Sequence, residues 1–217
     1  MAVLTWDADG TRLYQTGVEK CVLYPRDDNG TYPKGVSWPG ITQISESPSG
    51  AEPSPLYADN IKYLNLISTE ELELTIEAYM YPEEFEKCDG SAQLTPGVYM
   101  GQQGRQTFGL CYKTLMGNDV KNTEYGYKLH LVYGCTAAPS GREYSTVNDS
   151  PEAITLSWSV NTTPVNLSGY KPTTLLTIDS TKVQAAKLKA LEDVLYGTNT
   201  TEARLPLPNE VKTILET

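Results

Sequence analysis

Alternation of apolar and polar residues with a period of two recurs along much of this 217-residue chain. The stretch Ser68–Met80 shows it most clearly, because one set of positions is apolar and the other is mostly acidic. Successive side chains of a β-strand point to opposite faces, so the pattern predicts a half-buried strand. Its apolar face would hold Leu72, Leu74, Ile76 and Ala78, and its polar face Glu71, Glu73, Thr75 and Glu77.

Further strands are predicted by the same period. The clearest cover residues 19–25, 107–113, 127–133, 154–160 and 173–179. Two of these strands flank the turn GNDVKNTEYG. The first has Phe108, Leu110 and Tyr112 on one face, and the second has Tyr127, Leu129, Leu131 and Tyr133 on one face. Strands separated by such a turn are expected to form a β-hairpin.

The period changes to a helical one in residues 180–197. Apolar residues recur there at helical spacing, with Asp179 or Ser180 as the candidate N-cap and Gly197 as the residue that ends the helix. A short helix is expected to begin at Pro82, and a last turn or two can follow Pro208. The predicted fold is therefore mainly β, an antiparallel α+β architecture with one flanking amphipathic helix.

A segment rich in proline and glycine, residues 26–63, interrupts this pattern. Long loops in compact domains are uncommon and are usually functional or disordered, yet this one carries apolar residues that a disordered linker would lack. We favour an arm that docks on a neighbouring molecule, with Trp38, Leu56 and Tyr57 as its anchors. The other interpretation is an excursion that packs over its own domain.

Charge narrows the classes of partner. The chain has 17 basic and 27 acidic residues and a net charge of −10. Ordinary nucleic-acid binding needs clustered Lys and Arg, so that class is disfavoured, as is attraction to an anionic membrane surface. The N-terminal residues do not resemble a signal peptide, and the widely spaced Cys21, Cys88, Cys111 and Cys135 are expected to be free thiols.

The sequence offers no convincing catalytic, cofactor or metal site. The single histidine, His130, lacks a nucleophile motif elsewhere and is interpreted as structural. Residues 101–106, GQQGRQ, lack the lysine of a phosphate-binding loop, and the acidic turns DADG and DDNG lack the later glutamate of an EF-hand. A glycosidase pair among Glu71, Glu73 and Glu77 is disfavoured because their surroundings are uniform. We therefore expect a protein that is not an enzyme.

An ordered set of stretches suggests a family. They are SGAEPSPLYADNIKYLNLISTEELELTIEAYMYPEEFEKCDG, GQQGRQTFGLCYKT, GND, GYKLHLVYGCTAAPS, NDSPEAITLSWSVNTTPV and ARLPLPNEV. In this order and spacing the chain resembles the major tail tube proteins of long-tailed bacteriophages of the siphophage type. The resemblance implies one tail tube domain over 1–217. Its fold would be a β-sandwich or half-barrel with a long inter-subunit loop at about 26–63 and a C-terminal extension at about 198–217.

The same resemblance implies a structural virion protein, made in the cytoplasm of the bacterial host and assembled into the phage tail. Rings of about six copies would stack into a hollow tube whose inner strands close into one continuous barrel. The implied partners are identical copies, a tape measure protein, a tail terminator and tail tip proteins, with double-stranded DNA passing through non-specifically, no membrane and no cofactor. We expect Glu71, Glu73 and Glu77 to face the lumen, although the outer surface is the other possibility.

A different class of protein is also compatible with the composition. The chain holds 15 Tyr and 3 Trp but only 2 Phe, and exposed Tyr and Trp rings can stack on sugars. A carbohydrate-binding or adhesin β-sandwich is therefore the alternative, and a calcium-dependent hydrolase a more remote one. A lectin needs neither the proline-rich segment nor a one-sided acidic strand.

Overall fold

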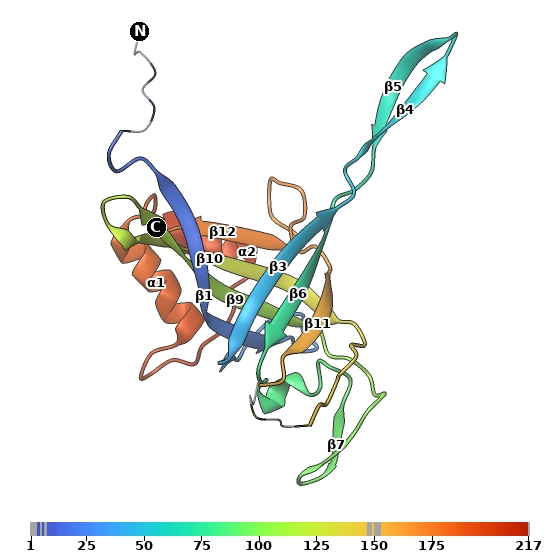
Figure 1. Cartoon of the computed structure of the whole chain (residues 1–217), viewed down its shortest axis with the longest axis vertical. Helices are drawn as coiled ribbons and strands as arrows, with labels where there is room; N and C mark the ends of the chain where they lie inside the picture. Colours follow the sequence, from blue (N-terminus) through green and yellow to red (C-terminus); the bar gives the residue numbers. More distant parts are fainter. Residues whose placement is uncertain (1–3, 5, 7, 147–148, 150–152, 217) are drawn as a thin grey trace.

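The sheet at the centre of the molecule is antiparallel throughout. The computed structural model describes residues 8–146, 149 and 153–216, together with Leu4 and Trp6. The outermost residues of the predicted 1–217 domain, including Thr217, lie outside the described residues. Within the described part, one sheet of eight strands, two separate two-stranded hairpins and two α-helices make up the fold (Figure 1). The predicted mainly-β, antiparallel class is confirmed.

The middle of the sheet is the predicted hairpin of β9 (Phe108–Asn118) and β10 (Asn122–Ala137), which pair along most of their length. Strand β1 (Leu13–Pro25) pairs with the other edge of β9, and the short β2 (Val36–Ser37) extends the sheet beyond β1. Residues on both faces of β9 are buried, since the body covers this strand from both sides.

The other half of the sheet leads from β10 to an end strand. Strands β11 (Leu156–Thr162) and β12 (Leu175–Asp179) pair with different parts of β10. Strand β6 (Glu71–Ala78) pairs with β11, and β3 (Ile41–Ser49) pairs with β6 and ends the path. All the strands predicted from the alternating pattern are therefore present.

Two buried apolar clusters lie on opposite faces of the sheet. The inner cluster draws on strands from both halves, so the sheet curls around it; it includes Trp38, Ile76, Phe85, Phe108, Leu110 and Trp158. The outer cluster lies under α1 (Ala185–Tyr196) and α2 (Pro208–Glu216) and includes Leu129, Leu131, Tyr133, Leu191 and Leu195. Both faces of the β9–β10 hairpin are therefore covered.

One glycine changes which residues of β10 face each cluster. Tyr133 packs in the outer cluster, whereas Cys135, two positions later, packs in the inner one. Between them Gly134 has a φ of 63°, and a Cβ there would lie 2.2 Å from Thr163 O. A larger residue would be excluded by strain and by this contact, so the glycine permits the bulge that reverses the alternation.

The helix boundaries correct one prediction and confirm another. Helix α1 begins after Gln184, not after Asp179 or Ser180. The Asp179 carboxylate instead accepts hydrogen bonds from the amide and hydroxyl of Thr181, so it closes a local turn before the helix starts. Gly197, at φ 77°, ends the helix as predicted, and α2 supplies the helical turns expected after Pro208.

The proline-rich segment 26–63 is not one long loop, which corrects the interpretation of that region. It contributes β2 and β3 to the main sheet and then β4 (Pro53–Ala58) and the start of β5 (Ile61–Ile67), which form a separate hairpin. A second hairpin, β7 (Ala92–Thr95) with β8 (Val98–Met100), follows the short 3-10 helix η1 (Glu83–Phe85). The two hairpins project at opposite ends of the long axis (Figure 1).

The described part of the predicted C-terminal extension, residues 198–216, lies against the body. Leu205 forms an isolated bridge with Tyr32, and both Leu205 and Val211 are buried in the outer cluster. Arg204 and Glu210 form an ion pair at its surface. All four cysteines are buried and free, as expected.

Candidate functional surfaces

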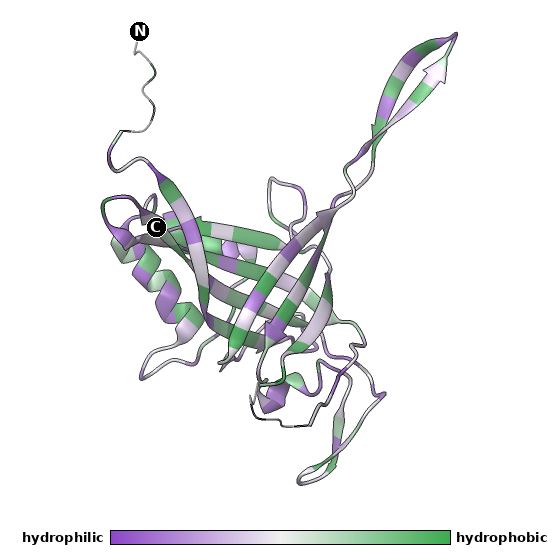
Figure 2. Cartoon of the chain, viewed as in Figure 1, coloured by the Kyte–Doolittle hydropathy of each residue, from purple (hydrophilic) through white to green (hydrophobic). Residues whose placement is uncertain are grey.

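The acidic face predicted for Ser68–Met80 exists and belongs to a wider polar surface. In β6, Leu74, Ile76 and Ala78 are buried, whereas Glu71 and Glu73 are exposed and Glu77 is half-buried. Residues directly opposite in an antiparallel pair share a face. The register therefore surrounds the carboxylates with small polar neighbours, which are Gln43, Ser45, Ser47 and Ser49 on β3 and Ser157, Ser159 and Asn161 on β11. Figure 2 shows the alternation along β3 and β6.

The carboxylates on this face carry uncompensated negative charge. Among the ion pairs of the described residues, none involves Glu71, Glu73 or Glu77, and no Lys or Arg belongs to the polar set on β3 and β11. In a wet environment two carboxylates at 4 Å repel by only about 1 kcal/mol, so the fold tolerates the row. We call the exposed side of β3, β6 and β11 the acidic face.

A different glutamate lies on the opposite, inner side of the same strands. Glu46 pairs in register with Leu74 and accepts a hydrogen bond from the Tyr112 hydroxyl. His130 stacks on Tyr112 at 4.7 Å between ring centroids, and its Nδ1 lies 3.3 Å from Glu46 Oε1. Its Nε2 lies 3.0 Å from Thr114 Oγ1. The contact with His130, followed by the Tyr112 hydrogen bond, lowers the pKa of Glu46 despite partial burial.

His130 is therefore a core residue that ties strands together, in line with its interpretation as structural. The four side chains come from β3, β9 and β10, so they link the end strand of the sheet to its central hairpin. Sequence reasoning missed Glu46, because neither its spacing nor its neighbours set it apart from the other acids of the proline-rich segment.

Two of the predicted arm anchors lie on the β4–β5 hairpin, which stands clear of the body (Figure 1). Leu56 is 44% exposed and Tyr57 is 71% exposed, and every residue of both strands is exposed. The chain crosses itself closely at the base of the hairpin, because a Cβ on Gly50 would lie 2.3 Å from Thr69 O. The hairpin is thus a discrete unit joined to β3 and β6 by a tight neck.

The third predicted anchor, Trp38, is in the wrong place for an arm. It is 2% exposed, and its ring lies 4.5 Å from that of Phe85 and 5.7 Å from that of Trp158, centroid to centroid. Its indole N–H donates to Met80 O at 2.9 Å. Trp38 therefore stabilises the inner cluster, which corrects its assignment to the inter-subunit surface.

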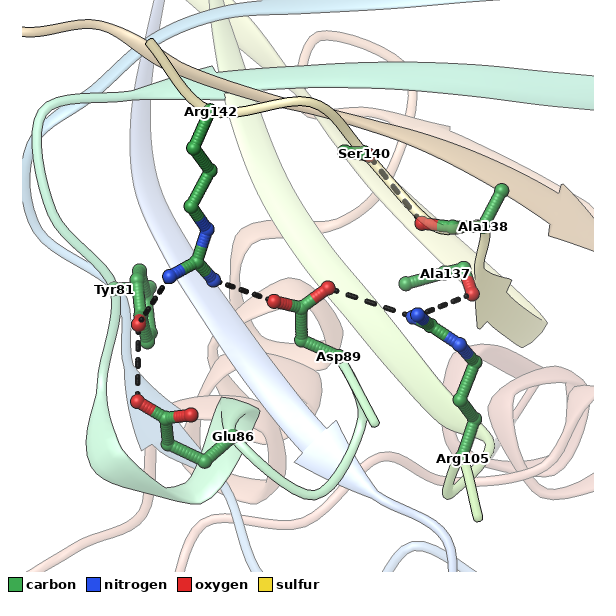
Figure 3. Close-up of polar contacts among 8 residues, drawn as sticks. All are labelled: Tyr81, Glu86, Asp89, Arg105, Ala137, Ala138, Ser140 and Arg142. Carbon is green, nitrogen blue, oxygen red and sulfur yellow. Dashed lines mark hydrogen bonds and ion pairs between the residues drawn. The ribbon is translucent and has the colours of Figure 1, made fainter. Parts of the chain in front are cut away.

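A second surface, which the sequence reasoning did not identify, is the β7–β8 hairpin. A polar network braces its base (Figure 3). Asp89 accepts from Arg142 Nη2 at 2.5 Å and forms an ion pair with Arg105 at 3.4 Å, while Arg105 also donates to Ala137 O. Arg142 further contacts Tyr81, whose hydroxyl donates to a Glu86 carboxylate oxygen. The sequence signal for this hairpin is the dipeptide Pro96–Gly97, which marks a turn between the short segments AQLT and VYM.

The candidate phosphate loop GQQGRQ is a connecting segment between two strands. Residues 101–106 form part of the chain that returns from β8 to β9, and Gln103 N donates to Gly90 O there. Within the described residues, no group of three or more His, Cys, Asp or Glu side chains is arranged to hold a metal ion. No helix of the described chain is long and apolar enough to cross a membrane.

Comparison with solved structures finds chains of similar structure. No family model matches the sequence, and no curated protein matches it. Among solved structures, a chain of the sheath–tube complex of an extracellular contractile injection system (PVC), in its extended state, is similar to this chain. The TM-score is 0.32 and the identity 10%, over 74% of this chain and 88% of the other.

Proposed function

We propose that this chain is a structural subunit that self-assembles into stacked rings and forms the tail tube of a phage, through which DNA leaves the particle. The support is the ordered resemblance to siphophage tail tube proteins together with two surfaces of the structure. The observation that carries the proposal is the β4–β5 hairpin, a long apolar projection that its own body does not cover.

The composition of this hairpin favours contact with another molecule. A lone two-stranded hairpin is marginally stable in water, and contiguous exposed apolar side chains usually mark an interaction site. Its exposed large apolar residues are Leu56, Tyr57, Ile61, Tyr63, Leu64, Leu66 and Ile67. Between Pro53 and Ile67 its only charged residues are Asp59 and Lys62, so its net charge is zero in a chain of net charge −10. A neighbouring copy can therefore cover it without charge repulsion.

The acidic face suits the wall of a DNA conduit. A protein that offers Lys and Arg to phosphates displaces counterions and holds DNA, whereas carboxylates offer no such contact. Their repulsion acts over a Debye length of about 8 Å at physiological salt, which is enough to keep a duplex off the wall. In the proposed ring, β3, β6 and β11 face the bore, and β3, which ends the sheet, is the strand that a neighbour can extend.

The proposed partners follow from this arrangement. They are identical copies in rings of about six, a tape measure protein inside the growing tube, and terminator and tip proteins at its ends. Double-stranded DNA passes without specific binding. The protein acts without a cofactor in the virion, after synthesis in the host cytoplasm.

The direct test is electron microscopy of the concentrated purified protein, with rings or tubes as the expected result. The matched variant removes residues 51–68 and joins Gly50 to Thr69, which are already in contact at the neck. A larger deletion of 30–60 would also remove β3 and Trp38 from the body, so it would confuse folding with assembly. We expect a folded monomer from the short deletion.

Two outcomes would contradict the proposal. Wild-type protein that stays monomeric at every concentration would contradict the proposal that it forms tubes. Glycan binding by that monomer would favour the carbohydrate-binding alternative. If the deletion variant formed tubes normally, the β4–β5 hairpin would not be part of the assembly surface.

The lumen assignment needs its own test. In phage particles that carry the triple substitution Glu71→Lys, Glu73→Lys and Glu77→Lys, we expect tubes to assemble and DNA ejection to slow, since the wall would now bind phosphates. The control reverses the exposed Glu84, Glu124 and Glu202, which lie off the acidic face and change the net charge equally. Ejection at the wild-type rate in the first variant would overturn the assignment of this face to the bore.

A further inference from the structure

The β7–β8 hairpin is a second projection without net charge, at the far end of the molecule from the β4–β5 hairpin (Figure 1). No Asp, Glu, Lys or Arg occurs from Gly90 to Gly104. At its tip Leu94 is 64% exposed and Val98 is 47% exposed, with Tyr99 and Met100 also exposed. An exposed apolar tip without charges is unusual in an acidic chain and suggests a surface that becomes covered.

The hairpin is held in a defined position. At its base Gln103 N donates to Gly90 O at 2.9 Å, and Arg105 reaches back to Asp89. Arg142 binds the other oxygen of Asp89 from a separate segment of the chain (Figure 3). Further out, the Tyr99 hydroxyl donates to a Glu83 carboxylate oxygen at 3.1 Å. A projection fixed at its base loses less conformational entropy on docking than a free loop does.

We propose that the tip of the β7–β8 hairpin docks on a second copy of this chain, at the end of the body that carries the β4–β5 hairpin. This inference rests on the proposed self-assembly and adds the contact between successive copies along the tube. Two copies of net charge −10 repel each other, so contacts between them are favoured where the surface carries no charge.

The receiving end offers a suitable surface. A pocket of about 450 Å³ lies beside the neck of the β4–β5 hairpin, lined by Pro48, Leu72, Pro164, Pro172 and Leu175 together with Glu46, Glu70 and Glu71. The lining also includes Thr173 and Thr174, so it is half apolar and half polar, and all of its charged residues are negative. A tip without carboxylates therefore avoids the charge repulsion that an acidic tip would meet there. The pocket, rather than the exposed hairpin itself, gives the tip a concave site.

A single molecule cannot make this contact in the observed fold. The pocket lies at the Glu71 end of β6, whereas η1 and the β7–β8 hairpin follow its Ala78 end. An eight-residue strand spans about 25 Å, which separates the two ends. The contact is therefore head-to-tail between copies, and such a contact repeats along an axis.

The first test places charge at the tip. The variant Leu94→Glu with Val98→Glu should fold normally, since both side chains are exposed, and should lose tubes while ring formation remains. The control Val120→Glu changes a residue that is 63% exposed in the β9–β10 turn and should leave tubes intact. Tubes of normal length from the tip variant would overturn the inference while leaving the proposed function standing.

The second test uses engineered disulfides. The double variant Leu94→Cys with Glu70→Cys should give a ladder of cross-linked multimers under mild oxidation. Each copy then carries one new thiol at its hairpin tip and one at its pocket, so cross-links can join many copies in a row. Each single variant should give no ladder. The native thiols should not interfere, since all four are buried and burial raises the pKa of Cys88 and Cys111 to about 12.

The outcomes separate the two proposals. Wild-type tubes with no ladder from the double variant would overturn the tip contact alone, and dimers from Leu94→Cys alone would show tip-to-tip contact instead. A wild-type protein that never assembles would overturn the tube and the tip contact together.

Discussion

The β9–β10 hairpin and the β4–β5 hairpin follow the same local rules but lie in opposite environments. Both consist of antiparallel strands rich in β-branched, aromatic and leucine residues. From Phe108 to Tyr112 every residue of β9 is buried, whereas every residue of β4 and β5 is exposed. The apolar content of a strand therefore predicts that it will be covered, but does not say by which molecule.

The difference arises from what lies above each face. The β9–β10 hairpin has the inner cluster on one side and the helices α1 and α2 on the other. The β4–β5 hairpin leaves the body at a tight neck, so neither cluster reaches it (Figure 1). If another copy covers the β4–β5 hairpin, substitutions in the β9–β10 hairpin should lower the stability of the monomer. Substitutions in the β4–β5 hairpin should instead weaken assembly.

The largest effect is expected from Leu110→Ala in β9. Leu110 is fully buried in the inner cluster, so its truncation leaves a cavity and should lower the free energy of unfolding by about 2–5 kcal/mol. Chemical denaturation of the monomer measures it. A loss below 0.5 kcal/mol, roughly the effect of an exposed substitution, would contradict the contrast between the two hairpins.

A smaller loss is expected from Asp89→Asn at the base of the β7–β8 hairpin. The substitution removes the charge that binds both Arg105 and Arg142, and it should lower the free energy of unfolding by about 1–3 kcal/mol. The lower end is expected because both arginines remain partly exposed. The control Glu84→Gln, at an exposed residue of η1, should change stability much less. Equal stability of the two variants would show that the network does not brace the hairpin.

The strands and α1 could be predicted from the sequence because their periodicity is local. Leu74 and Ile76 on one side of β6, with Glu73 and Glu77 on the other, identify both the strand and its faces. The pairing of β3 with β6 could not be predicted, because Pro48 and the neighbouring glycines resemble loop residues. In fact β3 ends the sheet, where a proline is tolerated.

The candidate surfaces show the same limit. Glu71, Glu73 and Glu77 were placed on one face correctly, since alternation fixes their side of the strand. Trp38 was misplaced because its burial depends on Phe85 and Trp158, which are distant in sequence. Leu56 and Tyr57, predicted as anchors of the arm, lie on a hairpin that the body does not cover, and their contact with a neighbouring copy stays a prediction.

The link between β3 and the β9–β10 hairpin predicts a dependence on pH. Contact with His130 and Tyr112 lowers the pKa of Glu46 below its ordinary value of 4.5, so the folded state binds this proton less readily than the unfolded state does. The stabilisation is complete above pH 4.5 and is lost as the pH falls through the lowered pKa. In denaturation curves measured at several pH values, Glu46→Gln should reduce the loss of unfolding free energy at low pH. Glu52→Gln, outside the cluster, should leave that loss unchanged. Identical declines in both variants would exclude Glu46 as the source.

The smallest effect on the monomer should come from the combined substitution Leu56→Ala and Tyr57→Ala in β4. Because both side chains are exposed, the free energy of unfolding should change by less than about 0.5 kcal/mol. The two side chains should contribute only to assembly. Light scattering should therefore show that the double variant needs a higher protein concentration than the wild type to form tubes. Leu13→Ala, an exposed leucine on β1, is the matched control and should affect neither. If the double variant destabilised the monomer as much as Leu110→Ala, the body itself would be covering this hairpin in solution. The contrast between the two hairpins would then be one of degree, and the need for a second copy would disappear.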